Sequence, residues 1–375
     1  MIHRIILEQI KNSLFKGKTL ILLGPRQSGK TTLLEMLSLE INEKVLILDC
    51  DEPDIRKELT DASSTQLKQR TGNAKVVMID EAQRVKNIGI TLKLFHDKIK
   101  DVQLIVTGSS SLELTGETSE PLTGRKYEYF LYPISTEEMI SNTDRTVEKR
   151  LLKNRLLYGM YPDVINEPGN ERKILNNLAG SYLYKDIFAF QDIRKPEIIE
   201  SLLEALALQI GSEVSYNELA TLLGIDQMTV RRYIDLLEKT FVLFRLRSFS
   251  RNVRNELKKS RKIYFYDNGI RNAILSNFSD IELRTDKGAL WENFLVSERN
   301  KLLNNHQVYA NKYFWRTTQQ QEIDYIEERD GQISAYEFKW NTNSRKKIPQ
   351  TFVKAYPESI TELINTDNYL DFLIY

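Results

Sequence analysis

A glycine-rich run near the N-terminus has the residue types and the spacing that bind a polyphosphate. The residues GPRQSGKT, numbered 24–31, fit the pattern G-x-x-x-x-G-K-[ST] at every fixed position. In this pattern the glycines let backbone N–H groups surround the phosphates, the lysine reaches the β- and γ-phosphates, and the hydroxyl coordinates Mg²⁺. We therefore expect Lys30 to be catalytic and Thr31 to bind the metal. The residues that we expect to contact the nucleotide are Gly24, Pro25, Arg26, Gln27, Ser28, Gly29, Lys30, Thr31 and Thr32.

A pair of acids follows an apolar run farther along the chain. The segment KVVMIDEAQ (75–83) ends its apolar part at Asp80 and Glu81. A nucleotide-bound Mg²⁺ needs a carboxylate at the end of a neighbouring strand, and we assign this role to Asp80. Glu81 is then placed to act as the general base for water. Two acids after a strand are common by themselves, but together with the upstream loop they predict hydrolysis of ATP or GTP. ATP and Mg²⁺ are the expected cofactors.

Two further features are candidates for the same site. A third apolar run, VQLIVTGSSSL, ends in hydroxyl residues, of which Ser109 or Ser110 is a candidate sensor of the γ-phosphate. A plain turn is the alternative, because Ser/Gly clusters commonly follow strands. Arg125, in PLTGRKYEYF, is a candidate catalytic arginine finger that reaches a neighbouring subunit. A structural role at the surface is the alternative for Arg125.

Near the C-terminus, a charged hairpin pattern carries a second group of acids. In QEIDYIEERDGQISAYEFKW (321–340), two β-type runs flank Asp330 and Gly331, a dipeptide suited to a two-residue type I′ turn. Such a turn places Asp324 directly opposite Glu337, with Cβ atoms roughly 5 Å apart. The register therefore predicts that the two carboxylates share one face of the hairpin.

These carboxylates are candidate ligands of a second Mg²⁺ ion. Glu292 approaches from a preceding amphipathic helix, while Asp324 and Glu337 are the expected metal ligands. Lys339 lies on the same face as Glu337 and would orient water or stabilise charge on a phosphate. All four residues are candidate catalytic groups. The alternative is a surface hairpin with cross-strand ion pairs, for example Glu322 opposite Lys339.

The first set of residues requires a parallel sheet. Apolar strand-like runs at 19–23, 45–49, 75–80 and 103–108 alternate with helical segments. This alternation predicts an α/β domain with a parallel sheet and helices on both faces. We place this domain at residues 1–140, followed by a helical linker or lid region at 141–200.

A helix–turn–helix–strand pattern over residues 201–260 predicts a winged helix. Its second helix carries Val230, Ile234 and Leu237 inward and leaves Arg231 and Arg232 outside. Residues 245–262 contain eight basic side chains and one acidic side chain. This basic segment follows the second helix, where the wing of a winged helix would contact DNA phosphates. Winged helices also act as protein–protein joints, which is the alternative. The expected DNA-binding residues are Arg231, Arg232, Arg251, Arg254 and Lys258.

The amino-acid composition argues against membrane, disulfide-rich and zinc-binding proteins. At 375 residues the chain is long enough for two or three domains, and 41% hydrophobic with 28% charged residues is typical of a globular protein. No apolar run approaches the roughly 20 residues that span a bilayer, so no membrane contact is expected. A single cysteine, Cys50, excludes an intrachain disulfide and is typical of the cytoplasm, and three histidines make a structural zinc site unexpected.

With these residues in place, the chain resembles a group of AAA-type P-loop ATPases of bacteria and archaea. Members of this group join a P-loop domain to a winged helix and to a C-terminal domain of unknown function with a restriction-endonuclease-like fold. The resemblance covers nearly the whole chain. The segments that carry it are GPRQSGKTTLL, IDEAQRV, TGSSSLEL, LTGRKYEYFLYPIS, MTVRRYIDLLEKTFVLFRL, KIYFYDNGI, GALWENF, EIDYI and YEFKW.

The resemblance implies roles and competing functions. The PD-(D/E)XK nuclease signature matches Asp324, Glu337 and Lys339, with Ile323 in place of the signature proline, and the domain would occupy residues 261–375. The group implies a homo-oligomer, a hexameric ring being one form, because its sites are completed across subunits. We therefore expect an ATPase that binds and remodels or translocates duplex or branched DNA. The alternatives are an ATP-dependent DNA nuclease and a nucleotide switch in signalling or defence that binds a protein partner.

Overall fold

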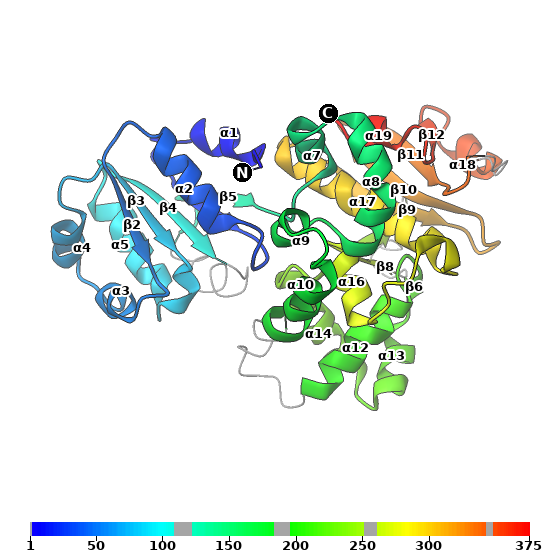
Figure 1. Cartoon of the computed structure of the whole chain (residues 1–375), viewed down its shortest axis with the longest axis horizontal. Coiled ribbons are helices and arrows are strands. Elements are labelled where there is room, and N and C mark those ends of the chain that lie inside the picture. Colours follow the sequence, from blue (N-terminus) through cyan, green and yellow to red (C-terminus); the bar gives the residue numbers. More distant parts are fainter. Residues whose placement is uncertain (1, 109–121, 184–195, 251–260, 343–347) are drawn as a thin grey trace. The chain divides into compact units, whose positions relative to one another are not determined.

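The chain folds into two compact units, each of which contains its own sheet (Figure 1). The P-loop unit comprises Arg4–Pro133 and Lys239–Phe241, and the C-terminal unit consists mainly of Ile134–Glu238 and Val242–Tyr375. The predicted α/β class is confirmed, with one parallel sheet typical of P-loop ATPases and a second, mixed sheet. The computed structural model describes residues 2–108, 122–183, 196–250, 261–342 and 348–375.

The sheet of the P-loop unit has five strands in the order β2-β3-β4-β1-β5, and every neighbouring pair is parallel. The four strands expected from the apolar runs are all present. Because parallel strands bring their carboxyl ends to one edge, the residues that follow β1, β3 and β4 meet at that edge. The strands are β1 (Thr19–Leu23), β2 (Val45–Asp49), β3 (Val76–Asp80), β4 (Gln103–Gly108) and β5 (Lys126–Phe130).

Apolar side chains bind the helices of this unit to the sheet. Leu7 of α1 and Leu34 and Leu37 of α2 pack with Leu22 and Met78 in one core, so these two helices share a face of the sheet (Figure 1). On the other face Ile79 is fully buried as well. The helices are α1 (Ile6–Lys11), α2 (Lys30–Glu40), α3 (Pro53–Leu59), α4 (Ser64–Thr71), the short 3-10 helix η1 (Ala82–Arg84) and α5 (Ile88–Lys98).

The C-terminal unit contains a seven-stranded mixed sheet in the order β12-β11-β10-β9-β7-β8-β6. Strand β7 pairs in parallel with β9, with Arg247 opposite Tyr313, so the strands of the predicted winged helix and the predicted nuclease-like domain share one sheet. The division into four domains stays a prediction. The strands are β6 (Glu213–Val214), β7 (Leu243–Ser248), β8 (Arg261–Phe265), β9 (Asn311–Arg316), β10 (Glu322–Arg329), β11 (Gln332–Phe338) and β12 (Ile360–Ile364).

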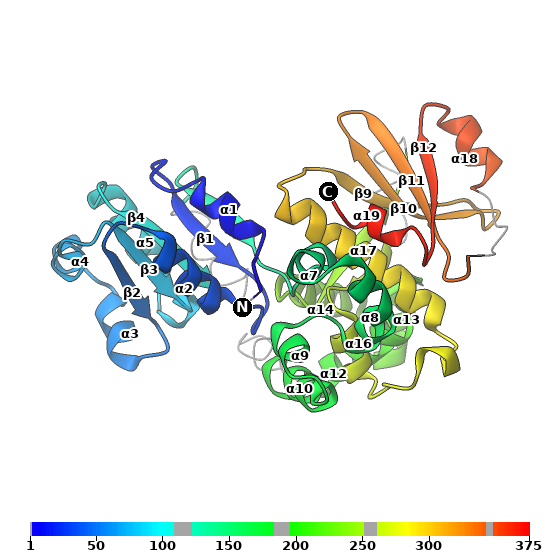
Figure 2. The same ribbon diagram turned by 45° about the horizontal axis from the view of Figure 1, so that its top comes forward.

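Helix α17 (Lys287–Asn305) lies along one face of this sheet (Figure 2). Asn293 accepts a hydrogen bond from the backbone N–H of Phe265 at 2.7 Å, and Arg299 pairs with Glu327 of β10 at 2.6 Å. The other helical segments are α7 (Thr136–Asn142), α8 (Arg145–Tyr158), α9 (Pro162–Asn166), α10 (Glu171–Asn177), the π-helix η2 (Leu178–Leu183), α12 (Pro196–Leu208), α13 (Tyr216–Leu223), α14 (Gln227–Lys239), α16 (Asn268–Ile274), the 3-10 helix η3 (Ile281–Leu283), α18 (Gln350–Ala355) and α19 (Tyr369–Phe372).

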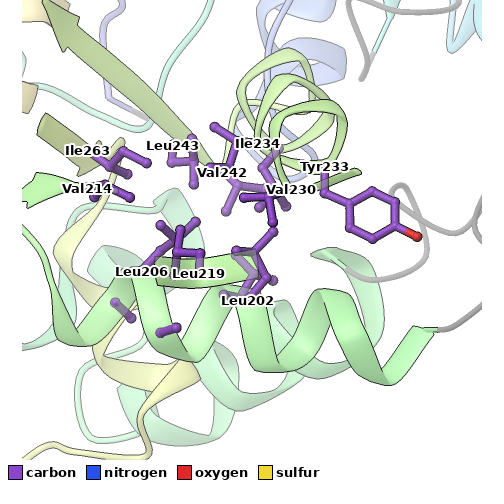
Figure 3. Packing of buried hydrophobic residues seen from close by; sticks show 14 of the residues in the cluster. Leu202, Leu206, Val214, Leu219, Val230, Tyr233, Ile234, Val242, Leu243 and Ile263 are labelled. Atoms are coloured by element: carbon purple, nitrogen blue, oxygen red, sulfur yellow. The ribbon is translucent and has the colours of Figure 1, made fainter. Parts of the chain in front are cut away.

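An apolar core joins α12, α13 and α14 to strands β7 and β8 (Figure 3). Val230 and Ile234 of α14 are fully buried in it, because their spacing places both on one face of the helix. Gly224 ends α13 with a φ of 64°, a left-handed conformation that glycine adopts at little steric cost. None of the described helices is long and apolar enough to cross a membrane.

Candidate functional site

The glycine-rich loop connects the end of β1 to the start of α2, as its spacing predicts. Gln27 and Gly29 adopt positive φ angles of 57° and 92°. A Cβ atom on Gly24 would lie 2.1 Å from the carbonyl oxygen of Leu131, so only glycine fits at this position. The loop is therefore bent sharply and held against the chain that follows β5, while the N-terminus of α2 opens directly behind it.

Lys30 is the first residue of α2, and its side chain folds over the loop. It is only 4% exposed, and its Nζ donates to the carbonyl oxygens of Gly24 at 3.1 Å and Pro25 at 2.9 Å. These contacts hold a positive charge beside the backbone N–H groups of the loop. Such an arrangement attracts an anion with several oxygen atoms.

Thr31 and Asp80 meet at the carboxyl edge of the sheet. The Thr31 hydroxyl donates to Asp80 Oδ2 at 2.6 Å, and Asp80 is buried. A hydroxyl and a carboxylate are oxygen ligands of the kind that Mg²⁺ prefers when it keeps several waters and binds phosphates. The two residues therefore fit a nucleotide-bound Mg²⁺.

Glu81 follows Asp80 in a left-handed conformation with φ of 51°. Its backbone N–H donates to the hydroxyl of Thr107 at 3.0 Å, and its carboxylate accepts from the side chain of Gln83 at 2.7 Å. The side chain is half-buried at the same sheet edge as Asp80. Glu81 is thus fixed in place by its backbone and by its side chain, which suits a group that must orient water.

Thr107 is a residue of this site that the sequence analysis missed. Its hydroxyl donates to Asp80 Oδ1 and accepts from the backbone of Glu81, so it links the two acids. The expected sensors Ser109 and Ser110 lie outside the described residues. One signal in the sequence could have indicated Thr107, because it is a hydroxyl residue next to the end of an apolar run. Since β4 pairs in parallel with β3, a residue at this position lies beside Asp80.

Arg4 was also missed. Its side chain is 6% exposed and donates to the carbonyl oxygens of Ser28 at 2.8 Å and Tyr132 at 2.6 Å. It therefore connects the glycine-rich loop to the chain after β5. No motif in the sequence indicates this contact, because the partners are backbone atoms distant along the chain.

Arg125 lies at the opposite end of the sheet from its own glycine-rich loop. Its carbonyl oxygen accepts from the backbone N–H of Thr19, the first residue of β1, and its side chain pairs with Asp97 at 2.9 Å. Arg125 thus does not reach the site of its own chain. Its role toward a neighbouring subunit stays a prediction.

The exposed side of α14 carries the described candidates for DNA contact. Arg231 and Arg232 are exposed, and Met228 is 70% exposed, on the side away from buried Val230 and Leu237. The other candidates, Arg251, Arg254 and Lys258, lie outside the described residues.

Two of the basic side chains in residues 245–262 form internal ion pairs. Arg245 pairs with Asp235 at 2.6 Å and also with Glu238, and Lys262 is 2% exposed among acids. These two side chains are therefore not part of a free basic surface. Arg247, in contrast, is exposed.

The C-terminal hairpin has the expected register. Asp330 and Gly331 have φ angles of 51° and 84°, and Tyr325 lies opposite Tyr336, so the next pair outward is Asp324 and Glu337. Asp324 Oδ2 accepts from the backbone N–H of Phe338 at 2.8 Å. The predicted type I′ turn therefore brings the two carboxylates to adjacent positions.

Lys339 lies beside both carboxylates, and burial raises the pKa of one of them. Lys339 Nζ lies 2.8 Å from Glu337 Oε1 and 3.9 Å from Asp324 Oδ2, and Glu337 is fully buried. Burial, with the carboxylates of Glu292 and Glu337, raises the pKa of Asp324 to about 7. Burial is the largest cause of this shift, and together with the two carboxylates it outweighs the attraction of Lys262 and Lys339.

Glu292 is occupied by other partners. Its Oε1 atom accepts from Lys262 Nζ at 2.9 Å and from the Tyr264 hydroxyl at 2.6 Å. Lys262 also pairs with Glu322 at 2.5 Å, so the alternative ion pair between Glu322 and Lys339 is not the one that forms. Across the described ranges, no three Asp, Glu, His or Cys side chains are arranged to hold a metal ion.

Three segments of the chain match known protein families. Residues 16–140 match the family described as AAA domain. Residues 149–281 match a domain of unknown function, DUF8612, and residues 287–369 match another, DUF4143. The family match and the geometry of the loop together identify the first of these regions as an AAA-type P-loop ATPase domain.

Relatives and solved structures extend this similarity over most of the chain. An uncharacterized protein of Mycobacterium tuberculosis is 28% identical over 337 residues, which cover 88% of this chain and 72% of that protein. An uncharacterized protein of Methanocaldococcus jannaschii is 23% identical over 386 residues, which cover 96% of this chain and 82% of that protein. The structure of a Walker-type ATPase of Pyrococcus abyssi aligns with a TM-score of 0.50 and 17% identity, covering 72% of this chain and 94% of that one. At this identity the alignment indicates a shared fold.

Proposed function

We propose that this AAA-type P-loop ATPase hydrolyses ATP with Mg²⁺ and uses the reaction to bind and remodel or translocate duplex or branched DNA. The observation that carries the ATPase part is the hydrogen bond from Thr31 to Asp80, with Glu81 fixed beside it. It unites the glycine-rich loop and the acidic strand end in one site, as nucleotide hydrolysis requires.

Each residue of the site has a defined task. Backbone N–H groups of the loop and the N-terminus of α2 bind the phosphates, and Lys30 neutralises charge on the β- and γ-phosphates. Thr31 and Asp80 would hold Mg²⁺, which offsets the charge on the phosphate oxygens. Glu81 takes a proton from a water molecule as the water oxygen attacks the γ-phosphorus and the bond to the β-phosphate oxygen breaks.

The exposed arginines of α14 support the DNA part of the proposal. Arg231 and Arg232 project from a helix whose other side is buried in the core, so the helix is rigid and its basic side is accessible. A rigid helix with exposed basic residues suits the major groove and its phosphates. Arg247, which is exposed on β7, adds a further positive charge.

The test compares ATP turnover and DNA binding for linear duplex, branched duplex and no DNA. We expect turnover to rise with one of the DNA forms, and native gels to show altered strand pairing that depends on ATP. A double variant, Arg231→Ala with Arg232→Ala, should weaken DNA binding about 10-fold or more and lower the salt dependence of binding. Turnover without DNA should stay unchanged.

The matched control is Arg150→Ala, which removes an exposed arginine of α8. This variant should bind DNA as the unaltered protein does. Turnover that ignores every DNA form, together with no DNA binding, would contradict the DNA part and leave the ATPase part standing. Binding of a protein partner through the same side of α14 would then be the function to pursue.

A further inference from the structure

A buried ammonium group lies inside the acidic cluster of the C-terminal sheet. Lys262, on β8, has its Nζ 2.9 Å from Glu292 Oε1 on α17 and 2.5 Å from Glu322 Oε1 on β10. The side chain is only 2% exposed, and its Nζ lies 5.5 Å from the ring centre of Phe314. Three elements therefore converge on one cation.

We propose that Lys262 takes the place of a divalent metal ion in this cluster, so that the acids anchor strand β8 and do not form a nuclease centre. The proposal concerns a site separate from the ATPase site and does not depend on the proposed function. It assigns a structural role to residues whose sequence pattern predicts Mg²⁺ and DNA cleavage.

The positions of the carboxylate oxygens carry the first step. Mg²⁺ needs ligand oxygens in near-octahedral geometry at roughly 2.0–2.1 Å. Glu292 Oε1 already accepts from Lys262 and from Tyr264. No three acidic, histidine or cysteine side chains in the described part of the chain have the arrangement of a metal site.

The charges carry the second step. Lys262 and Lys339 divide the acids between them, because Lys339 pairs with Glu337 while Lys262 pairs with Glu292 and Glu322. A divalent cation placed among these carboxylates would meet the buried ammonium group of Lys262 and the partly buried one of Lys339 at short range. Lys262, which is already part of the chain, pairs with Glu292 and Glu322 without that repulsion.

The topology explains what the cluster does instead. Strand β8 pairs with β7 and β6, whereas β10 lies beyond β9 in the same sheet. Lys262 connects β8 to β10 across this sheet and to α17 on its face. The ion pairs thus fasten β8, which pairs with β6 and β7 of the predicted winged helix, to β10 and α17.

The experiment uses full-length protein with Asp80→Asn, which silences the metal site of the ATPase domain. Binding of Mn²⁺ is followed by electron paramagnetic resonance without nucleotide, and thermal unfolding is measured with and without Mg²⁺. We expect that Asp324 binds no Mn²⁺ ion and that Mg²⁺ does not shift the unfolding temperature. Adding Asp324→Asn should therefore change neither the amount of bound Mn²⁺ nor the unfolding temperature.

Removing the ammonium should create the missing site. Lys262→Met, in the same background, is expected to bind one Mn²⁺ per chain and to unfold at a higher temperature when Mg²⁺ is present. The matched control is Lys312→Met, which removes another lysine of this sheet that is hydrogen-bonded to Asn300 and not to the acids. This control should bind no Mn²⁺.

Three results would overturn the proposal. One is a Mn²⁺ ion in the Asp80→Asn protein that is lost on adding Asp324→Asn or Glu337→Gln. Another is Mn²⁺-dependent nicking of DNA that Asp324→Asn abolishes. The third is a folded Lys262→Met variant that still binds no Mn²⁺. If Lys262→Met does not fold, the comparison of Asp80→Asn with and without Asp324→Asn decides the question alone.

Discussion

Asp80 shows at the scale of single residues how the ATPase site is built. The hydroxyls of Thr31 and Thr107 donate to its two carboxylate oxygens, and Thr107 also accepts from the backbone of Glu81. Three strands or their following segments therefore meet at one carboxylate. A group that fixes a metal ligand commonly matters nearly as much as the ligand itself.

Replacing Thr107 by valine tests this positioning role. Thr107→Val keeps the shape but removes the hydroxyl, so Asp80 and Glu81 lose a common partner. We expect kcat for ATP to fall about 10- to 100-fold, with ATP binding largely retained. Thr91→Val, which removes another buried threonine hydroxyl of this unit, is the control and should keep kcat. Equal activity of the two variants would contradict the role.

Glu81 and Lys30 are expected to fail in different ways. Glu81→Gln keeps the hydrogen-bonding shape but cannot accept the proton of water, so turnover should fall on the order of 10²- to 10⁴-fold while ATP still binds. Lys30→Ala removes the charge that neutralises the phosphates, so ATP binding itself should be lost. Binding of a fluorescent ATP analogue and a phosphate-release assay separate the two outcomes. Full turnover by Glu81→Gln would exclude it as the base.

Cys50 should be unreactive in the folded protein. It is fully buried, and burial together with nearby Asp49 and Asp80 raises the pKa of its thiol to about 12. Because the thiolate is the reactive form, a raised pKa leaves almost none of it at pH 8. Ellman's reagent should modify Cys50 only after unfolding in denaturant. Rapid modification of the native protein would show that this part of the unit opens readily.

At the scale of elements, the glycine-rich loop is held by the segments around it. The carbonyl of Leu131 leaves no room for a side chain at Gly24, and Arg4 connects Ser28 to Tyr132. The backbone N–H of Leu131 donates to Leu23 at 2.7 Å, which extends the pairing of β5 with β1 up to the loop. The shape of the loop therefore depends on the chain after β5 as well as on its own glycines.

Gly24→Ala tests this close packing. The added methyl group must displace the Leu131 carbonyl, so we expect a loss of about 1–3 kcal/mol in the free energy of unfolding and weaker ATP binding. Gly288→Ala in α17 is the control, since its added Cβ would meet nothing within 4 Å apart from the adjoining backbone of its own helix, and alanine should be neutral or stabilising there. Urea unfolding checks both. Native stability and ATP affinity in Gly24→Ala would contradict the packing argument.

At the scale of the whole molecule, the position of Arg125 bears on whether several copies of the chain assemble. It lies at the end of β5 that is remote from its own glycine-rich loop, paired with Asp97. A catalytic arginine at this end can act only in the site of another copy of the chain, as arginine fingers supplied in trans do. This role requires a homo-oligomer.

Mixing two inactive variants tests that role. Arg125→Ala and Glu81→Gln should each lose ATPase activity, whereas a mixture should regain part of it, because some neighbouring pairs then have an intact Glu81 and an intact Arg125. Light scattering gives the size of the assembly. Asp97→Ala is the control for a structural role: if it and Arg125→Ala lower stability alike and neither lowers turnover, Arg125 is only an ion-pair partner.

What the sequence by itself determined is the set of features fixed by local patterns. The spacing of GPRQSGKT and of the apolar runs specified the loop, Asp80 and the parallel strands. The Asp330–Gly331 turn specified the register of Asp324 against Glu337, because a two-residue turn sets every later pair of a hairpin.

Only the tertiary structure placed Thr107 beside Asp80, Arg4 beside Ser28, and Lys262 between Glu292 and Glu322. Each of these contacts depends on which strands become neighbours and which helix covers them. That choice is made by long-range pairing and burial over the whole chain, so a local signal such as the hydroxyl residue next to the end of β4 does not by itself reveal the contact. The same reason explains why strands expected in two domains share a single sheet, and why the candidate acid Glu292 pairs with Lys262.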